Sequence, residues 1–245
     1  MPGIAIVIPT YNEAGTIVEL LTAIRRVLPE AHLIIVDDGS PDGTAEIVRR
    51  VADQKVYLIE RIGKLGRGSA CLAGFRLAMT LPVDQVLEMD ADFSHAPAEL
   101  PGLLAITDNY GMTVASRYLA ESKIIGWPWQ RRWFSCLANH YIRTRLHLPL
   151  HDCTNGFRSY SRAALAGLDF DGFLTSGHIV LSEIACRLAN RGVTFYEVPT
   201  VFTDRRRGAS TVTWREIYNA FCGVNRLARH LLPKNTTATT PTTSQ

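Results

Sequence analysis

The sequence predicts an α/β fold in which a mostly parallel sheet is covered by helices on both faces. Short apolar runs of strand length recur along the first half of the chain, and segments of helical periodicity follow them. Polar turn residues separate these segments. Strands that alternate with helices of this length are typical of parallel sheets, because each helix returns the chain to the same edge. Such sheets bind ligands outside the carboxyl ends of their strands.

The first half of the chain supplies most of the expected sheet. We expect strands at residues 4–8, 33–36, 56–59, 86–89 and 114–115. Continuous apolar runs of this kind indicate strands that are buried on both faces. We expect the helices between them at residues 17–28, 44–52 and 68–81.

The second half has a different composition, with many Arg, Trp and His residues between positions 117 and 160. We expect helices at residues 132–146, 178–190 and 214–232, and a strand at 194–198. The last helix is amphipathic. The Thr-rich end of the chain lacks apolar anchors, so we expect one domain over residues 1–233 and a disordered tail over 234–245.

The composition excludes several classes of protein. The 245 residues are 47% hydrophobic, which excludes a disordered or fibrous chain, and no apolar run approaches the ~20 residues that cross a bilayer. The net charge of +3 is too small to indicate a nucleic-acid-binding protein. The five cysteines are scattered without a CxxC motif, so we expect no disulfide framework. Because the cysteines do not form such a framework and no leader signal precedes the first strand, we expect a reduced, cytoplasmic compartment.

A pair of carboxylates follows the strand expected at residues 86–89. Asp90 and Asp92 can jointly hold a divalent cation, and Mg²⁺ and Mn²⁺ complete such oxygen shells with substrate phosphates. Ser94 could add a hydroxyl or a bound water. For an isolated motif of this kind, a solvated acidic turn is the alternative interpretation.

Two other acidic segments also follow expected strands, at residues 11–13 and 37–42. The carboxylates and glycines of residues 37–44 can hydrogen-bond a nucleobase or ribose. An ordinary turn in which Asp42 or Thr44 caps the next helix explains the segment equally well. If the sheet prediction holds, the three acidic segments converge on one crevice.

Other motifs fail on inspection. Gly66 and Gly68 begin a dinucleotide-binding pattern that Cys71 does not complete, and no P-loop pattern occurs. His147 and His151 have the spacing of a zinc pair, but Pro149 lies between them and breaks the helix that such a pair needs. The three tryptophans at positions 127, 129 and 133 could stack on a sugar, lie at a membrane surface or pack in the core.

Four motifs in order carry a family resemblance: residues 7–13 (VIPTYNE), 36–44 (VDDGSPDGT), 64–68 (KLGRG) and 89–95 (MDADFSH). With shorter matches around Arg117, Trp127, Asp152, Gly156 and Asp204, they cover roughly residues 4–212. The sequence resembles glycosyltransferase family 2, and within it the dolichol- or polyprenol-phosphate mannosyltransferases. The resemblance implies a GT-A fold and inverting transfer of mannose from GDP-mannose to dolichyl or polyprenyl phosphate, assisted by Mg²⁺ or Mn²⁺.

The resemblance also implies roles for individual residues. The guanosine pocket is expected to be lined by Pro9, Tyr11, Glu13, Val36 and Asp38. The metal and the diphosphate are assigned to Asp90, Ala91 and Asp92, with Ser94 beside the metal. Arg117 is expected to meet the acceptor phosphate or the transferred sugar, with help from Arg131 or Arg132, while Arg205 clamps the donor diphosphate.

Two departures from the family pattern leave the sugar and the acceptor open. Thr211 stands where a lysine is usual, and one hypothesis is that Arg206 or Arg207 replaces it. Leu181 stands where a glutamine is common. The alternatives are transfer of glucose or another sugar to a lipid phosphate or a soluble acceptor, and a catalytically silent nucleotide-sugar-binding module. The basic residues of the last helix suit a membrane surface or a small membrane partner. Packing on the domain is the alternative, because amphipathicity alone does not distinguish the two.

Overall fold

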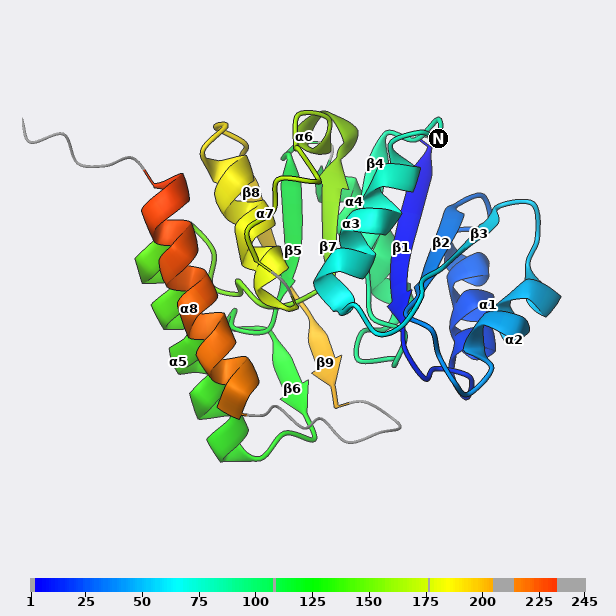
Figure 1. Cartoon of the computed structure of the whole chain (residues 1–245), viewed down its shortest axis with the longest axis horizontal. Coiled ribbons are helices and arrows are strands. Elements are labelled where there is room, and N and C mark those ends of the chain that lie inside the picture. The colour runs from blue at the N-terminus through cyan, green and yellow to red at the C-terminus, as the bar shows by residue number, and fades with distance from the viewer. Residues whose placement is uncertain (1–2, 108, 176, 205–213, 233–245) are drawn as a thin grey trace, which may run out of the picture.

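A computed structural model describes residues 3–107, 109–175, 177–204 and 214–232 of the chain (Figure 1). Its centre is a seven-stranded sheet, and a separate pair of strands lies beside it. In spatial order the strands of the larger sheet are β3 (Val56–Glu60), β2 (His32–Asp37), β1 (Ile4–Thr10), β4 (Gln85–Glu88), β7 (Arg158–Ser161), β5 (Met112–Ser116) and β8 (Phe195–Pro199). The smaller sheet pairs β6 (Lys123–Ile125) with β9 (Val201–Thr203) in parallel.

The helices cover both faces of the larger sheet, as the sequence predicted (Figure 1). Buried side chains of α1 (Ile17–Val27), α2 (Thr44–Val51) and α4 (Leu100–Thr107) belong to one core cluster. The other cluster contains buried side chains of α3 (Arg67–Ala78), α5 (Trp129–Leu146), α6 (Arg162–Leu165), α7 (Ile179–Ala189) and α8 (Trp214–Leu231). A 3₁₀ turn, η1 (Pro97–Glu99), precedes α4.

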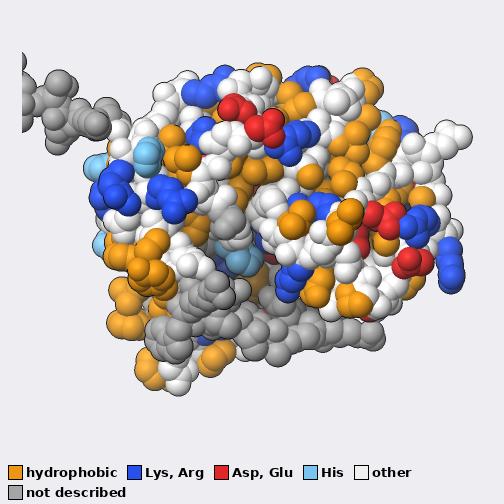
Figure 2. Space-filling view, viewed as in Figure 1, with side chains coloured by type: hydrophobic (Ala, Val, Ile, Leu, Met, Phe, Trp, Pro, Cys, Tyr) orange, Lys and Arg blue, Asp and Glu red, His pale blue; other side chains and the backbone are white. Residues whose placement is uncertain are grey.

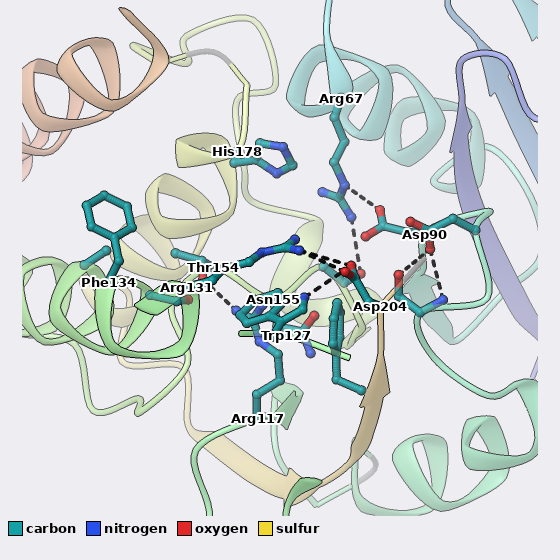
Figure 3. A pocket seen from close by; sticks show the side chains of 16 residues that line it. Arg67, Asp90, Arg117, Trp127, Arg131, Phe134, Thr154, Asn155, His178 and Asp204 are labelled. Carbon is teal, nitrogen blue, oxygen red and sulfur yellow. Dashed lines mark hydrogen bonds and ion pairs between the residues drawn. The ribbon is translucent and has the colours of Figure 1, made fainter. Parts of the chain in front are cut away.

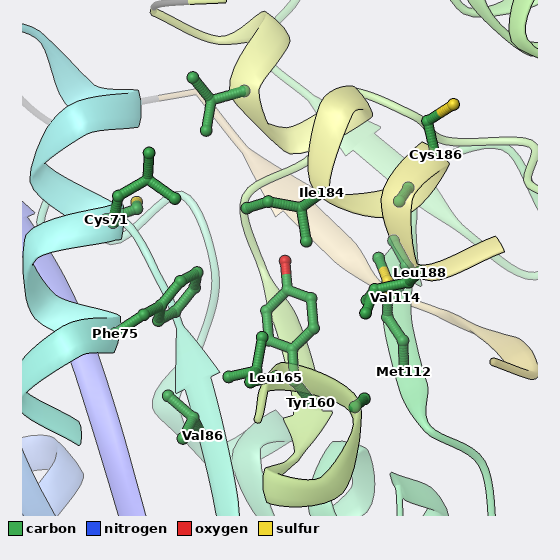
Figure 4. Close-up of a cluster of buried hydrophobic side chains, with 14 of the residues drawn as sticks. Cys71, Phe75, Val86, Met112, Val114, Tyr160, Leu165, Ile184, Cys186 and Leu188 are labelled. Atoms are coloured by element: carbon green, nitrogen blue, oxygen red, sulfur yellow. The ribbon is translucent and has the colours of Figure 1, made fainter. Parts of the chain in front are cut away.

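The strands explain why there are two core clusters. Successive side chains of a strand point to opposite faces, so in β1 Ala5 and Val7 join one cluster while Ile6 and Ile8 join the other. The sequence of a strand that is buried on both faces is therefore a continuous run of apolar residues. Figure 4 shows the cluster that contains side chains of α3 and α7, where the ring of Phe75 in α3 packs edge-on against Tyr160 of β7.

Strand β7 was not predicted, and it runs antiparallel to both of its neighbours, β4 and β5. Its sequence has no apolar run, although its side chains are buried. Arg158 donates hydrogen bonds to the carbonyls of Asn155 and Leu181, and Tyr160 donates one to Glu88. These hydrogen bonds satisfy most of the buried polar atoms of the strand, although Arg158 Nη2 and Ser159 Oγ have no hydrogen-bond partner among the described residues.

The remaining differences from the predictions are small. Helix α5 begins at Trp129 rather than at residue 132, because the carbonyl of the extended Pro128 already accepts hydrogen bonds from the amides of Arg131 and Arg132. The pair β6–β9 and helix α4 were also not predicted. The final helix is confirmed, and all five cysteines are free.

The parallel strands bring their carboxyl ends to one edge of the sheet. Thr10 at the end of β1 lies opposite Asp37 at the end of β2, and its hydroxyl donates to the Asp37 carboxylate at 3.0 Å. On the other side of β1, Val7 lies opposite Glu88, the last residue of β4. The loops that follow these strands therefore begin next to one another at the same edge of the sheet.

Candidate active site

A pocket of about 250 Å³ lies beyond the carboxyl ends of the strands (Figure 3). Its walls come from the start of α3, the loop after β4, the end of β5, the first turns of α5, the loop before β7 and the segment around β9. The charged residues that line it are Arg67, Asp90, Asp92, Arg117, Arg131 and Asp204. Five of the residues that were expected to act on metal, donor or acceptor therefore meet in one pocket: Asp90, Asp92, Ser94, Arg117 and Arg131.

The acidic pair after β4 is held in place by its own loop. One oxygen of Asp92 accepts hydrogen bonds from both the backbone amide and the hydroxyl of Ser94. Ser94 is almost fully buried. Its hydroxyl thus orients Asp92 in this structure.

Asp90 pairs with a residue that the sequence analysis did not single out, Arg67. The Arg67 Nε atom lies 2.6 Å from Asp90 Oδ1. Burial tends to raise the pKa of Asp90, but the neighbouring guanidinium charge outweighs this effect, and the pKa falls to about 2. Arg67 lies in the KLGRG segment, whose glycines form the recognisable pattern while nothing in the spacing marks the arginine.

Asp90 and Asp92 are the side chains that fit a divalent metal ion. Both are carboxylates that line the pocket, and hard cations such as Mg²⁺ and Mn²⁺ prefer oxygen ligands. Within the described ranges, no group of three or more His, Cys, Asp and Glu side chains is arranged to hold a metal. A metal here would need additional oxygen ligands from substrate phosphates.

Arg117 is fixed at the end of β5 by a buried, two-pronged ion pair. Its Nε and Nη2 atoms lie 2.7 Å and 2.8 Å from the two carboxylate oxygens of Asp152. Although burial opposes the charged form, the Arg117 charge lowers the pKa of Asp152 to about 2. The Arg117 guanidinium also lies 5.4 Å from the ring centres of Trp127 and Phe202. This surrounding holds the arginine in one orientation at the pocket wall.

Arg131 and Arg132 were alternatives from the sequence, and the structure separates them. Arg131 faces the pocket, stacks at 4.1 Å over Trp127 and lies 3.1 Å from both carboxylate oxygens of Asp204. Arg132 is exposed and donates to the carbonyl of Ile124. Trp127 itself is buried and donates to Asp204 at 3.3 Å.

The residues expected around guanosine lie next to this pocket rather than in its wall. Asp38 pairs with Arg61 at 2.6 Å and accepts from the backbone amide of Gly66, the residue before Arg67. Gly66 takes a positive φ of 96°, which glycine adopts easily. Tyr11 lies 4.1 Å beneath the ammonium group of Lys64.

Other expected site residues have different surroundings. Pro9 and Glu13 are half-buried, and a Glu13 carboxylate oxygen accepts a hydrogen bond from Thr16. The side chains of Val36 and Ala91 are buried in the core clusters. Arg205, Arg206, Arg207 and Thr211 lie outside the described residues, as does the whole of the expected tail at residues 234–245.

His95 is a second residue that the sequence analysis did not assign. Its Nε2 atom lies 2.8 Å from the amide oxygen of Asn155, and its ring stacks on Phe157 at 4.7 Å. Burial lowers the pKa of His95 to about 4. The neutral ring thus joins the loop of the acidic pair to the loop that carries Asp152.

The rejected zinc pair is confirmed as two surface histidines. His147 ends α5 with a positive φ, and His151 contacts Glu197 at 2.7 Å. Both are exposed.

An apolar surface borders the pocket on the side of α5. Phe134 lines the pocket and is partly exposed, and Trp129 and Trp133 are 72% and 63% exposed. We call this surface the apolar rim. It comprises Trp129, Trp133, Phe134 and Leu137 of α5 with Tyr218 and Phe221 of α8. Figure 2 shows hydrophobic side chains gathered at the lower left, where the beginnings of α5 and α8 lie in Figure 1.

Comparison with known proteins identifies the family. Residues 5–168 match the model of glycosyl transferase family 2. The chain belongs to this family. It is 36% identical over 219 residues to a polyprenol monophosphomannose synthase of Mycolicibacterium smegmatis, covering 88% of this chain and 83% of that protein. It is 35% identical over 222 residues to an undecaprenyl-phosphate mannosyltransferase of Micrococcus luteus, covering 90% and 91%.

The fold has close counterparts among solved structures. Glucosyl-3-phosphoglycerate synthase from Mycobacterium tuberculosis, solved with Mn²⁺, UDP and glucosyl-3-phosphoglycerate, superimposes with a TM-score of 0.67 at 18% identity. The match covers 96% of this chain and 82% of that one. The GT-A fold that the family resemblance implied is therefore confirmed.

Proposed function

We propose that the protein transfers a mannosyl group from GDP-mannose, with inversion, to the phosphate of a polyprenyl lipid. One observation carries the proposal: the pocket that holds the acidic pair and two arginines opens beside the apolar rim. The names of the two relatives, which describe transfer of mannose to polyprenyl phosphates, agree with this chemistry.

The donor would extend from Asp38 to the acidic pair. The backbone of Gly66 and Arg67 connects these two places, because Gly66 donates to Asp38 while Arg67 pairs with Asp90. A nucleoside bound near Asp38, Tyr11 and Glu13 would place its diphosphate over Asp90 and Asp92. Guanine and mannose are proposed on the family resemblance, and the geometry favours a nucleotide sugar in general.

Asp90 and Asp92 would hold Mg²⁺ or Mn²⁺ against the donor diphosphate. When bound, such a metal would offset the negative charge that develops on the departing nucleoside diphosphate. Ser94 orients Asp92 for this task through its two hydrogen bonds. Either metal suits a pair of carboxylates.

The acceptor phosphate would lie between Arg117 and Arg131. The Nε and Nη2 hydrogens of Arg117 are taken by Asp152 and Thr154, so its Nη1 group is left to donate to a phosphate oxygen, and Arg131 would add a second guanidinium. Arg117 is already oriented by Asp152, so little side-chain entropy is lost when the phosphate binds. Because a phosphate monoester is ionised at neutral pH, it can attack the sugar without a general base.

The apolar rim would receive the isoprenoid chain and lie against the membrane surface. Tryptophan is favoured at the boundary between headgroups and acyl chains. Arg226 and Arg229, exposed residues of α8, would face anionic headgroups. None of the helices in the described part of the chain is long and apolar enough to cross a membrane.

The test is a turnover assay with a panel of donors. Purified protein and Mn²⁺ are incubated with GDP-mannose, GDP-glucose, UDP-glucose or UDP-N-acetylglucosamine, with and without polyprenyl phosphate. We expect a lipid-phosphate-linked mannose from GDP-mannose alone. Transfer from UDP-glucose would reassign the donor. Absence of turnover with every donor, despite binding of a nucleotide, would favour a silent binding module.

A further inference from the structure

Arg67 occupies a position that conflicts with a simple metal site. It is the first residue of α3, and its side chain reaches down to the acidic pair (Figure 3). Its Nε atom lies 2.6 Å from Asp90 Oδ1, and its Nη2 atom makes a long hydrogen bond of 3.4 Å to the carbonyl of Gly156. The guanidinium of Arg67 therefore already neutralises Asp90, a carboxylate that suits the role of a metal ligand.

The same guanidinium also serves a second, deeper carboxylate. Glu88 is fully buried at the end of β4, and one of its oxygens accepts from the hydroxyl of Tyr160 at 2.8 Å. Its other oxygen lies 3.7 Å from Arg67 Nη1, and neither of these two atoms has a hydrogen-bond partner among the described residues. One guanidinium thus balances two carboxylates and keeps unused donor capacity.

Apart from its contact with Asp90, the Arg67 guanidinium is held only by weak hydrogen bonding. A Cβ atom on Gly156 would lie only 1.9 Å from Arg67 Nη2, so the absence of a side chain at this position is what admits the arginine. The Nη2 hydrogen bond is near the upper limit of length, and Nη1 lacks good hydrogen-bond geometry. Only the contact from Nε to Asp90 is short.

A divalent ion at Asp90 and the Arg67 charge would repel each other. A unit charge and a divalent ion about 5 Å apart weaken binding by more than about ten-fold even at the dielectric constant of water. A donor diphosphate changes this balance, because it brings two negative charges and oxygens that match the guanidinium fork.

We propose that Arg67 is the counter-ion of Asp90 in the metal-free enzyme and that it passes from Asp90 to the donor diphosphate when metal and nucleotide bind together. Arg67 thereby makes metal binding depend on the nucleotide: the metal binds weakly alone and tightly with a nucleoside diphosphate. This inference rests on the proposed function, because it requires a diphosphate donor in the pocket.

The experiment measures Mn²⁺ affinity of the purified full chain, from the electron paramagnetic resonance signal of free Mn²⁺, with and without GDP. In Arg67→Met we expect the dissociation constant for Mn²⁺ alone to fall at least about ten-fold, by the Coulomb argument above. The factor by which GDP tightens Mn²⁺ binding should also fall at least about ten-fold in this variant. By thermodynamic linkage, the factor by which Mn²⁺ tightens the binding of GDP should fall by the same amount. The control is Arg76→Met, because Arg76 lies on the same helix and pairs with Asp171 at the surface.

Two further variants guard against loss of folding. Arg67→Met leaves Glu88 as an unpaired buried charge, so the double variant Arg67→Met/Glu88→Gln removes that charge while the amide oxygen introduced at position 88 can still accept from Tyr160. Gly156→Ala keeps every charge and displaces only the far end of a flexible side chain. We expect Gly156→Ala to tighten Mn²⁺ binding in the parent protein and to have no effect in the Arg67→Met background.

The outcomes separate this inference from the proposed function. A folded Arg67→Met protein with parental Mn²⁺ affinity would overturn the role of Arg67, whatever the donor. An additive effect of Gly156→Ala and Arg67→Met would overturn it as well. If the parent protein binds Mn²⁺ and GDP but forms no product with any donor, the proposed function fails while the Mn²⁺ comparison still decides the role of Arg67.

Discussion

The buried histidine behind the acidic pair predicts how stability depends on pH. His95 has a pKa of about 4 in the folded protein, lowered by burial, against an ordinary value of 6.5. Between these two values the unfolded chain binds a proton that the folded protein does not bind. The free energy of unfolding therefore falls as the pH drops from about 6.5 toward 4.

The size of this effect follows from the two pKa values. The full difference corresponds to about 3.4 kcal/mol, and about 2.5 kcal/mol of it is lost between pH 7 and pH 4.5. The aspartates Asp90 and Asp152 also stabilise the fold through lowered pKa values, both about 2. Because their ordinary value is 3.8, their contributions are lost only at lower pH, as it falls toward 2.

The variant His95→Gln isolates the contribution of the imidazole. A glutamine amide can still donate to Asn155, but it does not titrate. We expect the parent protein to lose about 2.5 kcal/mol more than the variant between pH 7 and pH 4.5, in urea unfolding followed by tryptophan fluorescence with EDTA present. Equal losses in the two proteins would show that His95 is not held neutral by burial.

The other predictions concern the proposed reaction. Asp92→Asn should lower transfer at saturating Mn²⁺ by more than about 10²-fold with an unchanged circular dichroism spectrum, and near-parental turnover would exclude a metal role. Arg117→Lys keeps the charge but loses the fork to Asp152, so the KM for lipid phosphate should rise about ten-fold while the KM for the donor stays constant. Replacing Trp129 and Trp133 by serine should weaken binding to anionic vesicles at least about ten-fold, as measured by co-sedimentation. Unchanged binding would show that the apolar rim does not contact the membrane.

The sequence predicted the elements whose signal is local. The first two strands are continuous apolar runs because both faces of the sheet are covered, so strand length and burial could be inferred together. The alternation of strands and helices then placed three acidic segments at one edge, which Asp37, Asp90 and the residues near them confirm.

The missed features depend on contacts between distant segments. Strand β7 carries polar side chains whose partners, Glu88 among them, are more than 20 residues away or lie in loops, so no periodic pattern marks it. The contact between Arg67 and Asp90 requires α3 to begin directly above the end of β4, which depends on how the helix packs. Arg117 and Arg131 came from the family resemblance alone, because nothing in their spacing brings the ends of β5 and α5 together.

The charges of the described residues around the pocket support the proposed metal site on grounds that do not depend on the family. Three arginines of the described residues line the pocket, at positions 67, 117 and 131, and each has a carboxylate partner: Asp90, Asp152 and Asp204. Asp92 lines the pocket as well, and Glu88 lies beneath Arg67. Within the described part of the chain these five carboxylates outnumber the three guanidinium groups by two charges. These residues alone would repel a donor diphosphate, and a divalent ion held by Asp90 and Asp92, as proposed above, would offset that repulsion.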